Sequence, residues 1–295
     1  MVAWILNFDA DDELASPRGA HTSSRAMLER MESLVPRLEG LIDRGDVVLR
    51  PGDRLPGGRE DVGDAWCLTP SALERLRRGG ARVPPAPTFE VLRKVNGRAF
   101  SAALGQTLLH AVYAASLEEV LEALASGSRA YGSWLLKRPF GFAGRGRRKV
   151  RASAVTPEDL AWIAASVREH GGLQAEPLVA RNGDFAIHAH LAADGTLTLG
   201  DPTLQVCDDN GAWLSTAVAA KDDLARDERD ALIEGARDVA RALHDAAYFG
   251  PFGVDAYRWS DAAGVRRFNR RSEINARYSM GWGIGMRSVR TRLQT

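Results

Sequence analysis

Two apolar runs near the C-terminus carry their polar residues in a pattern that few folds accommodate. The first run contains Asp255, and the second contains Glu273 and Asn275. Side chains alternate between the two faces of a strand, so Glu273 and Asn275 share a face if the second run is a strand. In a hairpin of the two runs, Asp255 can lie opposite them on the same face. The pattern predicts a β-hairpin that gathers two carboxylates and an amide oxygen.

The chemistry of these three side chains points to a hard divalent cation. Oxygen ligands without a neighbouring His or Cys suit Mg²⁺ or Mn²⁺ far better than Zn²⁺. The alternative is that the two carboxylates only form ion pairs with the arginines of the same region, which are Arg258, Arg266, Arg267, Arg270, Arg271 and Arg277.

The overall composition limits the possible partners. The chain has 295 residues, 45% of them hydrophobic, and 39 basic residues against 38 acidic ones. Such a chain can bury a substantial core, and its near-zero net charge provides no global field that would attract nucleic acid or an anionic membrane. We therefore expect small-molecule partners and no nucleic acid or membrane; the sequence leaves the oligomeric state open.

The N-terminus and the cysteines indicate the compartment. Residues 2–8 are apolar but too few for a signal peptide, and acidic residues follow at once. Cys67 and Cys207 are far apart and lack metal-site spacing, which is typical of two buried thiols in a reducing compartment. We expect a cytoplasmic protein.

Strands and helices alternate over the first eighty residues. Apolar periodicity predicts strands at 2–8, 46–49 and 65–68, and helices at 25–42 and from Pro70 onward. This alternation favours a small α/β domain with a mainly parallel sheet. A proline-rich linker at 83–87 then ends the domain.

The remainder of the chain contains helices first and strands later. Helical spacing predicts helices at 89–104, 117–125 and 157–169, and residues 133–137 form a strand pattern. From residue 173 the pattern is rich in strands: an alternating run at 185–191 is followed by a hairpin turn at Asp194-Gly195 and a returning strand at 196–199. A long helix is expected at 222–247, followed by the hairpin.

Lys137 ends the strand pattern at 133–137 and is followed by a loop that contains Gly141, Gly144 and Gly146. Backbone N–H groups of such a loop can approach an anion closely, and the lysine adds a point charge suited to phosphate. It is not a Walker loop, because the Gly-Lys-Ser/Thr ending is absent. The alternative is a simple hairpin turn.

An extended segment at 173–179 contains Glu176, Leu178 and Val179, and Asp184 opens the next strand pattern. An extended backbone offers hydrogen bonds to a purine edge, and a carboxylate can accept from ribose hydroxyls. The alternative places both acids in solvent.

Taken in order, these features resemble the ATP-grasp superfamily, whose members close two lobes on a nucleotide. The resemblance covers residues 95–279, and the preceding segment is similar to the small α/β domain that commonly precedes this fold. It implies an α+β protein whose two lobes have antiparallel sheets. The expected domains are residues 1–86 (small α/β domain), 87–172 (first lobe with the glycine loop) and 173–295 (second lobe with the metal hairpin).

The resemblance also implies roles for the basic residues. Arg98, with Lys94 as a rival, and Lys137 reach the phosphates of ATP. The loop with its three glycines folds over the β- and γ-phosphates, where Arg145 supplements it.

On the nucleoside side, the resemblance implies that Glu176 and the backbone at Leu178 and Val179 hold adenine and that Asp184 holds ribose. The spacing of Glu176 and Asp184 is slightly longer than in some members.

At the metal end, Asp255, Glu273 and Asn275 bind one or two Mg²⁺ ions, according to the resemblance. Arg277 completes a Glu-x-Asn-x-Arg variant and steadies an acyl phosphate or carboxylate; its alternative is an ion pair with Asp255 or Glu273.

The implied activity is ATP-dependent joining of a carboxylate to an amine or thiol through an acyl phosphate, on a small metabolite, amino acid or peptide. The alternatives are a kinase of the same fold and a non-catalytic nucleotide-binding module of a larger assembly. His188 and His190 share a face with Asp184, so one of them is a candidate base, although packing is the more common role of a strand histidine. Trp213 and Trp282 are candidates for shaping the acceptor pocket.

Overall fold

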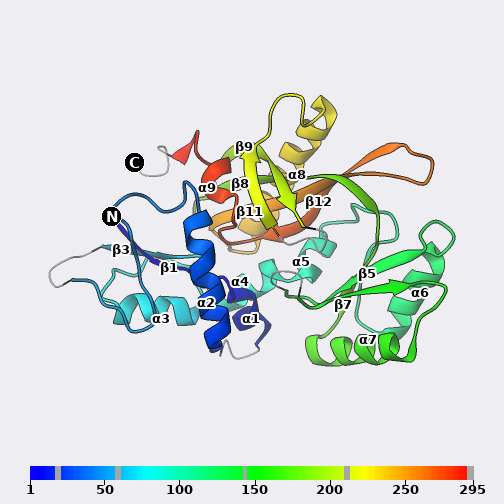
Figure 1. Ribbon diagram of the computed structural model, residues 1–295, viewed down its shortest axis with the longest axis horizontal. Helices are drawn as coiled ribbons and strands as arrows, with labels where there is room; N and C mark the ends of the chain where they lie inside the picture. The colour runs from blue at the N-terminus through cyan, green and yellow to red at the C-terminus, as the bar shows by residue number, and fades with distance from the viewer. Residues whose placement is uncertain (17–20, 57–60, 142–144, 209–212, 291–295) are drawn as a thin grey trace.

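Three regions, each with its own β-sheet, make up the molecule (Figure 1). The structure is a computed structural model that describes residues 1–16, 21–56, 61–141, 145–208 and 213–290. Among these residues, no helix is both long and apolar enough to cross a bilayer.

The N-terminal region is a small α/β unit, as predicted. Its parallel three-stranded sheet has the order β2-β1-β3, in which β1 is Val2–Ile5, β2 is Val47–Val48 and β3 is Val62–Ala65. The helices are α1 (Ala10–Ala15), α2 (Arg25–Leu34), a 3₁₀ turn (Val35–Arg37) and α3 (Pro70–Arg78).

Two predicted boundaries in this region are wrong. The strand expected at 65–68 ends at Ala65, because Cys67 instead forms hydrogen bonds with the side chain of Asn7. The helix expected at 25–42 ends at Leu34, because Pro36 cannot donate a backbone hydrogen bond to continue it.

The middle region contains a four-stranded antiparallel sheet in the order β4-β7-β5-β6, and α6 and α7 pack against it. The helix expected at 89–104 is divided at Gly97, whose extended backbone ends α4 and caps α5. Because β7 pairs with β5, this sheet extends to Pro177, five residues past the expected lobe boundary at 172. The elements are α4 (Phe89–Asn96), α5 (Arg98–Ala103), β4 (Val112–Ala114), α6 (Leu117–Gly127), β5 (Ser133–Lys137), β6 (Arg147–Arg151), α7 (Pro157–His170) and β7 (Leu173–Pro177).

The C-terminal region is a five-stranded antiparallel sheet in the order β10-β9-β8-β11-β12, with the long helix α8 packed against four of its strands. Both larger sheets are antiparallel, which confirms the predicted two-lobe α+β architecture. The elements are β8 (Ala180–Leu191), β9 (Leu197–Cys207), β10 (Trp213–Val218), α8 (Arg226–Asp245), β11 (Gly250–Ser260), β12 (Arg266–Asn275) and α9 (Trp282–Gly285).

The predicted C-terminal hairpin is present as β11 and β12. Asp255 pairs with Glu273 and Gly253 pairs with Asn275, so the three polar side chains share one face of the sheet. The register shifts between Asp255 and Tyr257, so an irregularity of the ladder lies immediately beside these residues.

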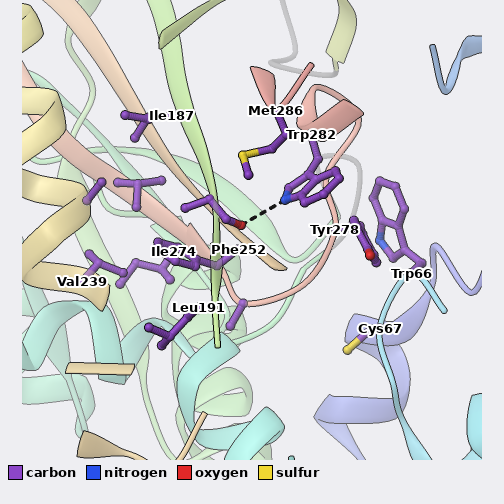
Figure 2. Packing of buried hydrophobic residues seen from close by; sticks show 14 of the residues in the cluster. Trp66, Cys67, Ile187, Leu191, Val239, Phe252, Ile274, Tyr278, Trp282 and Met286 are labelled. Atoms are coloured by element: carbon purple, nitrogen blue, oxygen red, sulfur yellow. Dashed lines mark hydrogen bonds between the residues drawn. The ribbon is translucent and has the colours of Figure 1, made fainter. Parts of the chain in front are cut away.

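The N-terminal and C-terminal regions share one hydrophobic core, whereas the middle region has its own around Trp134. Tyr278 joins the first two, with its ring 5.3 Å from that of Trp4 and 4.8 Å from that of Trp282. Figure 2 shows the buried Trp282 beside Tyr278, and its Nε1 donates to the carbonyl of Ala189 over 3.0 Å. Two regions therefore form a common base, and the middle lobe packs separately against it.

Candidate functional site

A cleft runs along the polar face of the hairpin and is bordered by all three regions. Five of the residues expected to form the site line it, namely Gly141, Asp255, Glu273, Asn275 and Arg277. We call the part formed by Gly141, Arg147, Asp255, Glu273 and Asn275 the phosphate end of the cleft. The part formed by Leu34, Trp66, Cys207, Trp213 and Met280 is the acceptor end.

Asp255 is a carboxylate whose hydrogen-bond partners are both neutral. It accepts from Gln205 Nε2 over 3.2 Å and from Asn275 Nδ2 over 3.1 Å. Burial and the nearby charge of Glu273 raise its pKa to about 7. A buried carboxylate next to a second carboxylate, without an ion-pair partner of its own among the described residues, favours binding of a cation.

Glu273 has the opposite electrostatic environment. Burial acts to raise its pKa, but the positive charges of Arg98, Lys137, Arg147 and Arg277 outweigh that effect and lower it to about 2. Arg98 Nη2 lies 2.8 Å from Glu273 Oε1. The carboxylate is therefore ionised at any physiological pH.

Arg98 connects the hairpin to the glycine loop. Besides its ion pair with Glu273, it donates to the carbonyls of Arg138 over 2.8 Å and Pro139 over 3.3 Å. Its rival Lys94 is exposed on α4. Of the two, Arg98 is the cation that reaches the cleft walls.

Lys137 and Glu176 form a buried ion pair behind the phosphate end, with Nζ 2.5 Å from Oε1. Burial lowers the pKa of Lys137, and the charge of Glu176 opposes this shift. The strand pairing explains their proximity, because β5 lies between β6 and β7 in the sheet.

Arg147 is a cleft residue to which the sequence analysis assigned no separate role. It lies on β6 directly opposite Lys137, so the two cations lie on the same face of the sheet. The sequence could have indicated this position, because the strand that follows the glycine loop is expected to pair with the strand that precedes it and so to bring Arg147 opposite Lys137.

The glycine loop is tightly folded where it is described. A Cβ on Gly141 would lie 2.7 Å from the carbonyl oxygen of Arg145, and Gly146 has φ +69°, so both positions require glycine. Arg145 extends to the N-terminal region, where its Nη2 lies 2.9 Å from Asp12 Oδ2. Gly144, also expected to hold phosphate, lies outside the described residues.

The residues expected to hold the nucleoside follow one another along β7 and β8. The amide of Leu178 donates to Ser133 O over 2.9 Å, and Val179 packs beside Tyr257 and Trp259. Asp184 Oδ1 lies 3.3 Å from Arg181 Nη1. These residues and Glu176 do not belong to the lining of the cleft within the described chain.

Arg277 is held by the N-terminal region rather than by Asp255 or Glu273. Its Nη2 lies 2.9 Å from Asp11 Oδ2, and its Nη1 donates to Tyr278 O over 3.2 Å. Its Nε is buried without a hydrogen-bond partner among the described residues. The guanidinium also lines the cleft, and its fork of donors suits a bound carboxylate or phosphate. Sequence reasoning missed Asp11, because nothing local links residues 266 positions apart.

His188 is a packed residue of the sheet interior. It is fully buried, with Nδ1 3.1 Å from Ser279 Oγ and Nε2 3.4 Å from Thr203 Oγ1. Burial lowers its pKa to about 3. This matches the packing alternative rather than a base. Burial also lowers the pKa of His190.

The two tryptophans expected at the acceptor pocket lie in different places. Trp213 lines the cleft, whereas Trp282 lies in the shared core away from it. Trp66 and Leu34 of the N-terminal region form further apolar wall, which sequence reasoning did not anticipate.

The donor set at the phosphate end fits a divalent cation. Asp255 and Glu273 face each other across the hairpin, and each contributes carboxylate oxygens, the ligands that Mg²⁺ prefers. Asn275 presents its NH₂ group to Asp255, so its amide must turn over before the oxygen faces a cation. The site has two carboxylates and an amide, and no group of three His, Cys, Asp or Glu side chains converges here or at any other place in the described ranges.

Comparisons with known protein structures identify the fold of the chain. No protein-family model and no curated protein sequence matches the chain. A biotin carboxylase from Campylobacter jejuni, in a complex with βγ-ATP, aligns with a TM-score of 0.54 and 16% identity over 74% of this chain and 48% of its own. An N5-carboxyaminoimidazole synthetase from Staphylococcus aureus, complexed with ADP, aligns with a TM-score of 0.51 and 14% identity over 94% of this chain and 70% of its own.

A third structure covers almost all of the chain. Pyruvate carboxylase from Rhizobium etli aligns with a TM-score of 0.54 and 16% identity over 97% of this chain and 27% of its own. The chain thus spans about half the length of the biotin carboxylase and a smaller part of the pyruvate carboxylase. The architecture common to all three alignments, two antiparallel lobes beside a cleft, is the ATP-grasp fold, and this chain has it.

Proposed function

We propose that the protein is an ATP- and Mg²⁺-dependent ligase that joins a carboxylate to an amine or thiol through an acyl phosphate. The acceptors are small molecules. We place the reaction in the cytoplasm, and the unpaired thiols of Cys67 and Cys207 support a reducing compartment.

One observation carries this proposal: carboxylates lie on one side of the phosphate end and basic side chains lie on the other. On one side, Asp255 and Glu273 face each other. On the other side, Lys137 and Arg147 occupy neighbouring positions of one sheet face, and Arg98 bridges to the hairpin. A triphosphate chain with a divalent cation complements both sides at once.

Each group of residues would have a separate role in phosphoryl transfer. Asp255, Glu273 and Asn275 would hold Mg²⁺, which supplies charge neutralisation for the β- and γ-phosphates when bound. Arg98, Lys137 and Arg147 would stabilise negative charge on the phosphates. Glu176, with the backbone at Leu178 and Val179, would hold adenine, and Asp184 would hold ribose.

The bond changes need no protein nucleophile. A carboxylate oxygen of the substrate attacks the γ-phosphorus, ADP leaves, and an acyl phosphate forms. The amine nitrogen then attacks the acyl carbon, and phosphate leaves with the bonding electrons while the nitrogen loses a proton. The guanidinium of Arg277, which lines the cleft, is suited to holding the acyl phosphate during this exchange.

The decisive experiment is Glu273→Gln. We expect ligase turnover to fall by about 10³-fold or more, because the variant loses a charged cation ligand in a dry site. The measurement is ADP and phosphate release with MgATP, a carboxylate and an amine, and the thermal midpoint without nucleotide shows whether the fold survives. The matched control is Asp261→Asn in the exposed turn of the same hairpin, which should leave turnover unchanged.

The outcomes separate the alternatives. Release of ADP and phosphate only when acid and amine are both present supports the ligase. Stable transfer of phosphate to an acceptor would identify a kinase instead. Binding of MgATP without any turnover would identify a non-catalytic module, and full activity of Glu273→Gln would show that the metal site is wrong.

A further inference from the structure

The acceptor end of the cleft differs chemically from the phosphate end. Its walls are side chains from four distant segments, namely Leu34 of α2, Trp66 after β3, Trp213 of β10 and Met280 before α9. Each of these presents carbon or sulfur surface. Such surface binds an apolar group by removing it from water.

Two polar groups in these walls are already occupied. Trp213 donates its Nε1 hydrogen to Thr216 Oγ1 over 2.7 Å, and Ser279 Oγ is engaged with His188 Nδ1 over 3.1 Å. The indole of Trp213 is further fixed by the Arg37 guanidinium, 4.7 Å from its ring centre. The exposed guanidinium of Arg30 also lines the cleft, so a ligand meets one cation beside carbon surface rather than a set of groups that match many hydroxyls.

Arg277 lies directly beside these apolar walls. The residue after it donates its backbone N–H to Trp66 O over 3.1 Å, and Arg277 and Trp66 both line the cleft. A guanidinium in this lining can bind a carboxylate whose organic group extends toward the tryptophans.

We infer that the acid activated by this protein carries an apolar body of aromatic or branched aliphatic type, bound between Trp66, Trp213, Leu34 and Met280. The inference rests on the proposed function for the reacting carboxylate. It adds the substrate class, an acid with an apolar body in preference to a sugar acid or a phosphorylated acid.

The test measures binding rather than turnover, so that it stands apart from the ligase assay. Saturation-transfer NMR in the presence of MgADP compares 3-phenylpropionate and 4-methylpentanoate with gluconate and 3-phosphoglycerate. We expect transfer to the body protons of the two apolar acids and at least about tenfold weaker binding of the other two. Equal or tighter binding of gluconate or 3-phosphoglycerate would overturn the inference.

A pair of neighbouring variants locates the binding. Trp213→Ala should weaken 3-phenylpropionate by about tenfold or more and leave MgADP affinity unchanged, because the indole forms the wall. Leu214→Ala, on the exposed adjacent residue outside the cleft lining, should change neither. Unchanged binding of 3-phenylpropionate to Trp213→Ala would refute the assignment. If the apolar acids bind normally but no acid is turned over, the result counts against the proposed function and not against this inference.

Discussion

The two ends of the cleft are built by different means. At the phosphate end, the charged side chains extend from paired strands, and the ladders between β5, β6 and β7 and between β11 and β12 set their positions. At the acceptor end, the walls come from α2, the segment after β3 and the segment before α9, which meet only through tertiary packing.

Because of this difference, the phosphate end is expected to tolerate sequence change, whereas the acceptor end is expected to vary with the sequence of its segments. Strand register fixes side-chain positions within narrow limits, so a nucleotide site built on strands tolerates much sequence change elsewhere. Walls assembled from separate segments vary as those segments vary, and the substrate can change while the nucleotide site stays the same. The predictions that follow test whether the two ends are as independent as this comparison implies.

The largest effect is expected from Lys137→Met, behind the phosphate end. Loss of the buried ammonium should weaken MgATP by about 100-fold, equal to about 2.7 kcal/mol, because a charged contact to phosphate disappears. Isothermal titration measures the affinity, and binding of 3-phenylpropionate should stay the same. Lys221→Met, at an exposed lysine before α8 and outside the cleft lining, is the control and should bind MgATP normally.

A smaller effect on function is expected from Asp11→Asn, which removes the anion that holds Arg277. We expect kcat/KM for the acid to fall by about tenfold with MgATP affinity unchanged, because the guanidinium loses its fixed position. The unfolding free energy should fall by about 3 kcal/mol, since a buried charge is left uncompensated. In contrast, Asp12→Asn breaks a half-exposed pair with Arg145 and should cost less than about 1 kcal/mol. A large loss of MgATP affinity in Asp11→Asn would show that the two ends are coupled.

The smallest effect concerns pH and His188, beneath the acceptor end. Its pKa is about 3 in the folded protein against 6.5 for an ordinary histidine. Between these two pKa values, the unfolded chain binds one more proton at His188 than the folded chain does. The contribution of the neutral His188 to stability is therefore complete above pH 6.5 and is lost as pH falls. The loss is up to about 1.4 kcal/mol per pH unit.

Denaturant titrations at pH 6.0 and 5.0 measure this slope. His188→Gln should lose less stability than the unsubstituted protein on the same acidification, because it carries no titrating group in either state. The exposed His244→Gln is the control and should retain the original slope. Identical slopes for all three proteins would mean that His188 is not kept neutral by the fold.

The local parts of the site could be predicted from the sequence because period-2 patterning fixes which residues share a strand face. This is how Asp255, Glu273 and Asn275 were brought together correctly. The strand β5 and the capped start of α7 at Thr156 were also apparent, since each has a local signal. Periodicity says nothing about contacts between distant segments, so Asp11 beside Arg277 and Trp66 in the acceptor wall could not be found. The role of Trp282 was missed because an indole alone does not show whether it faces a cleft or a core.

The ion pair between Arg98 and Glu273 joins residues that lie 175 positions apart in the chain. A ribosome must therefore synthesise the chain through Glu273 before these two charges can meet. Until β12 has emerged, Arg98 and Lys137 lack the carboxylates of the hairpin opposite them. If ATP binds at the proposed site, only chains that already contain β12 gain stability from it during synthesis.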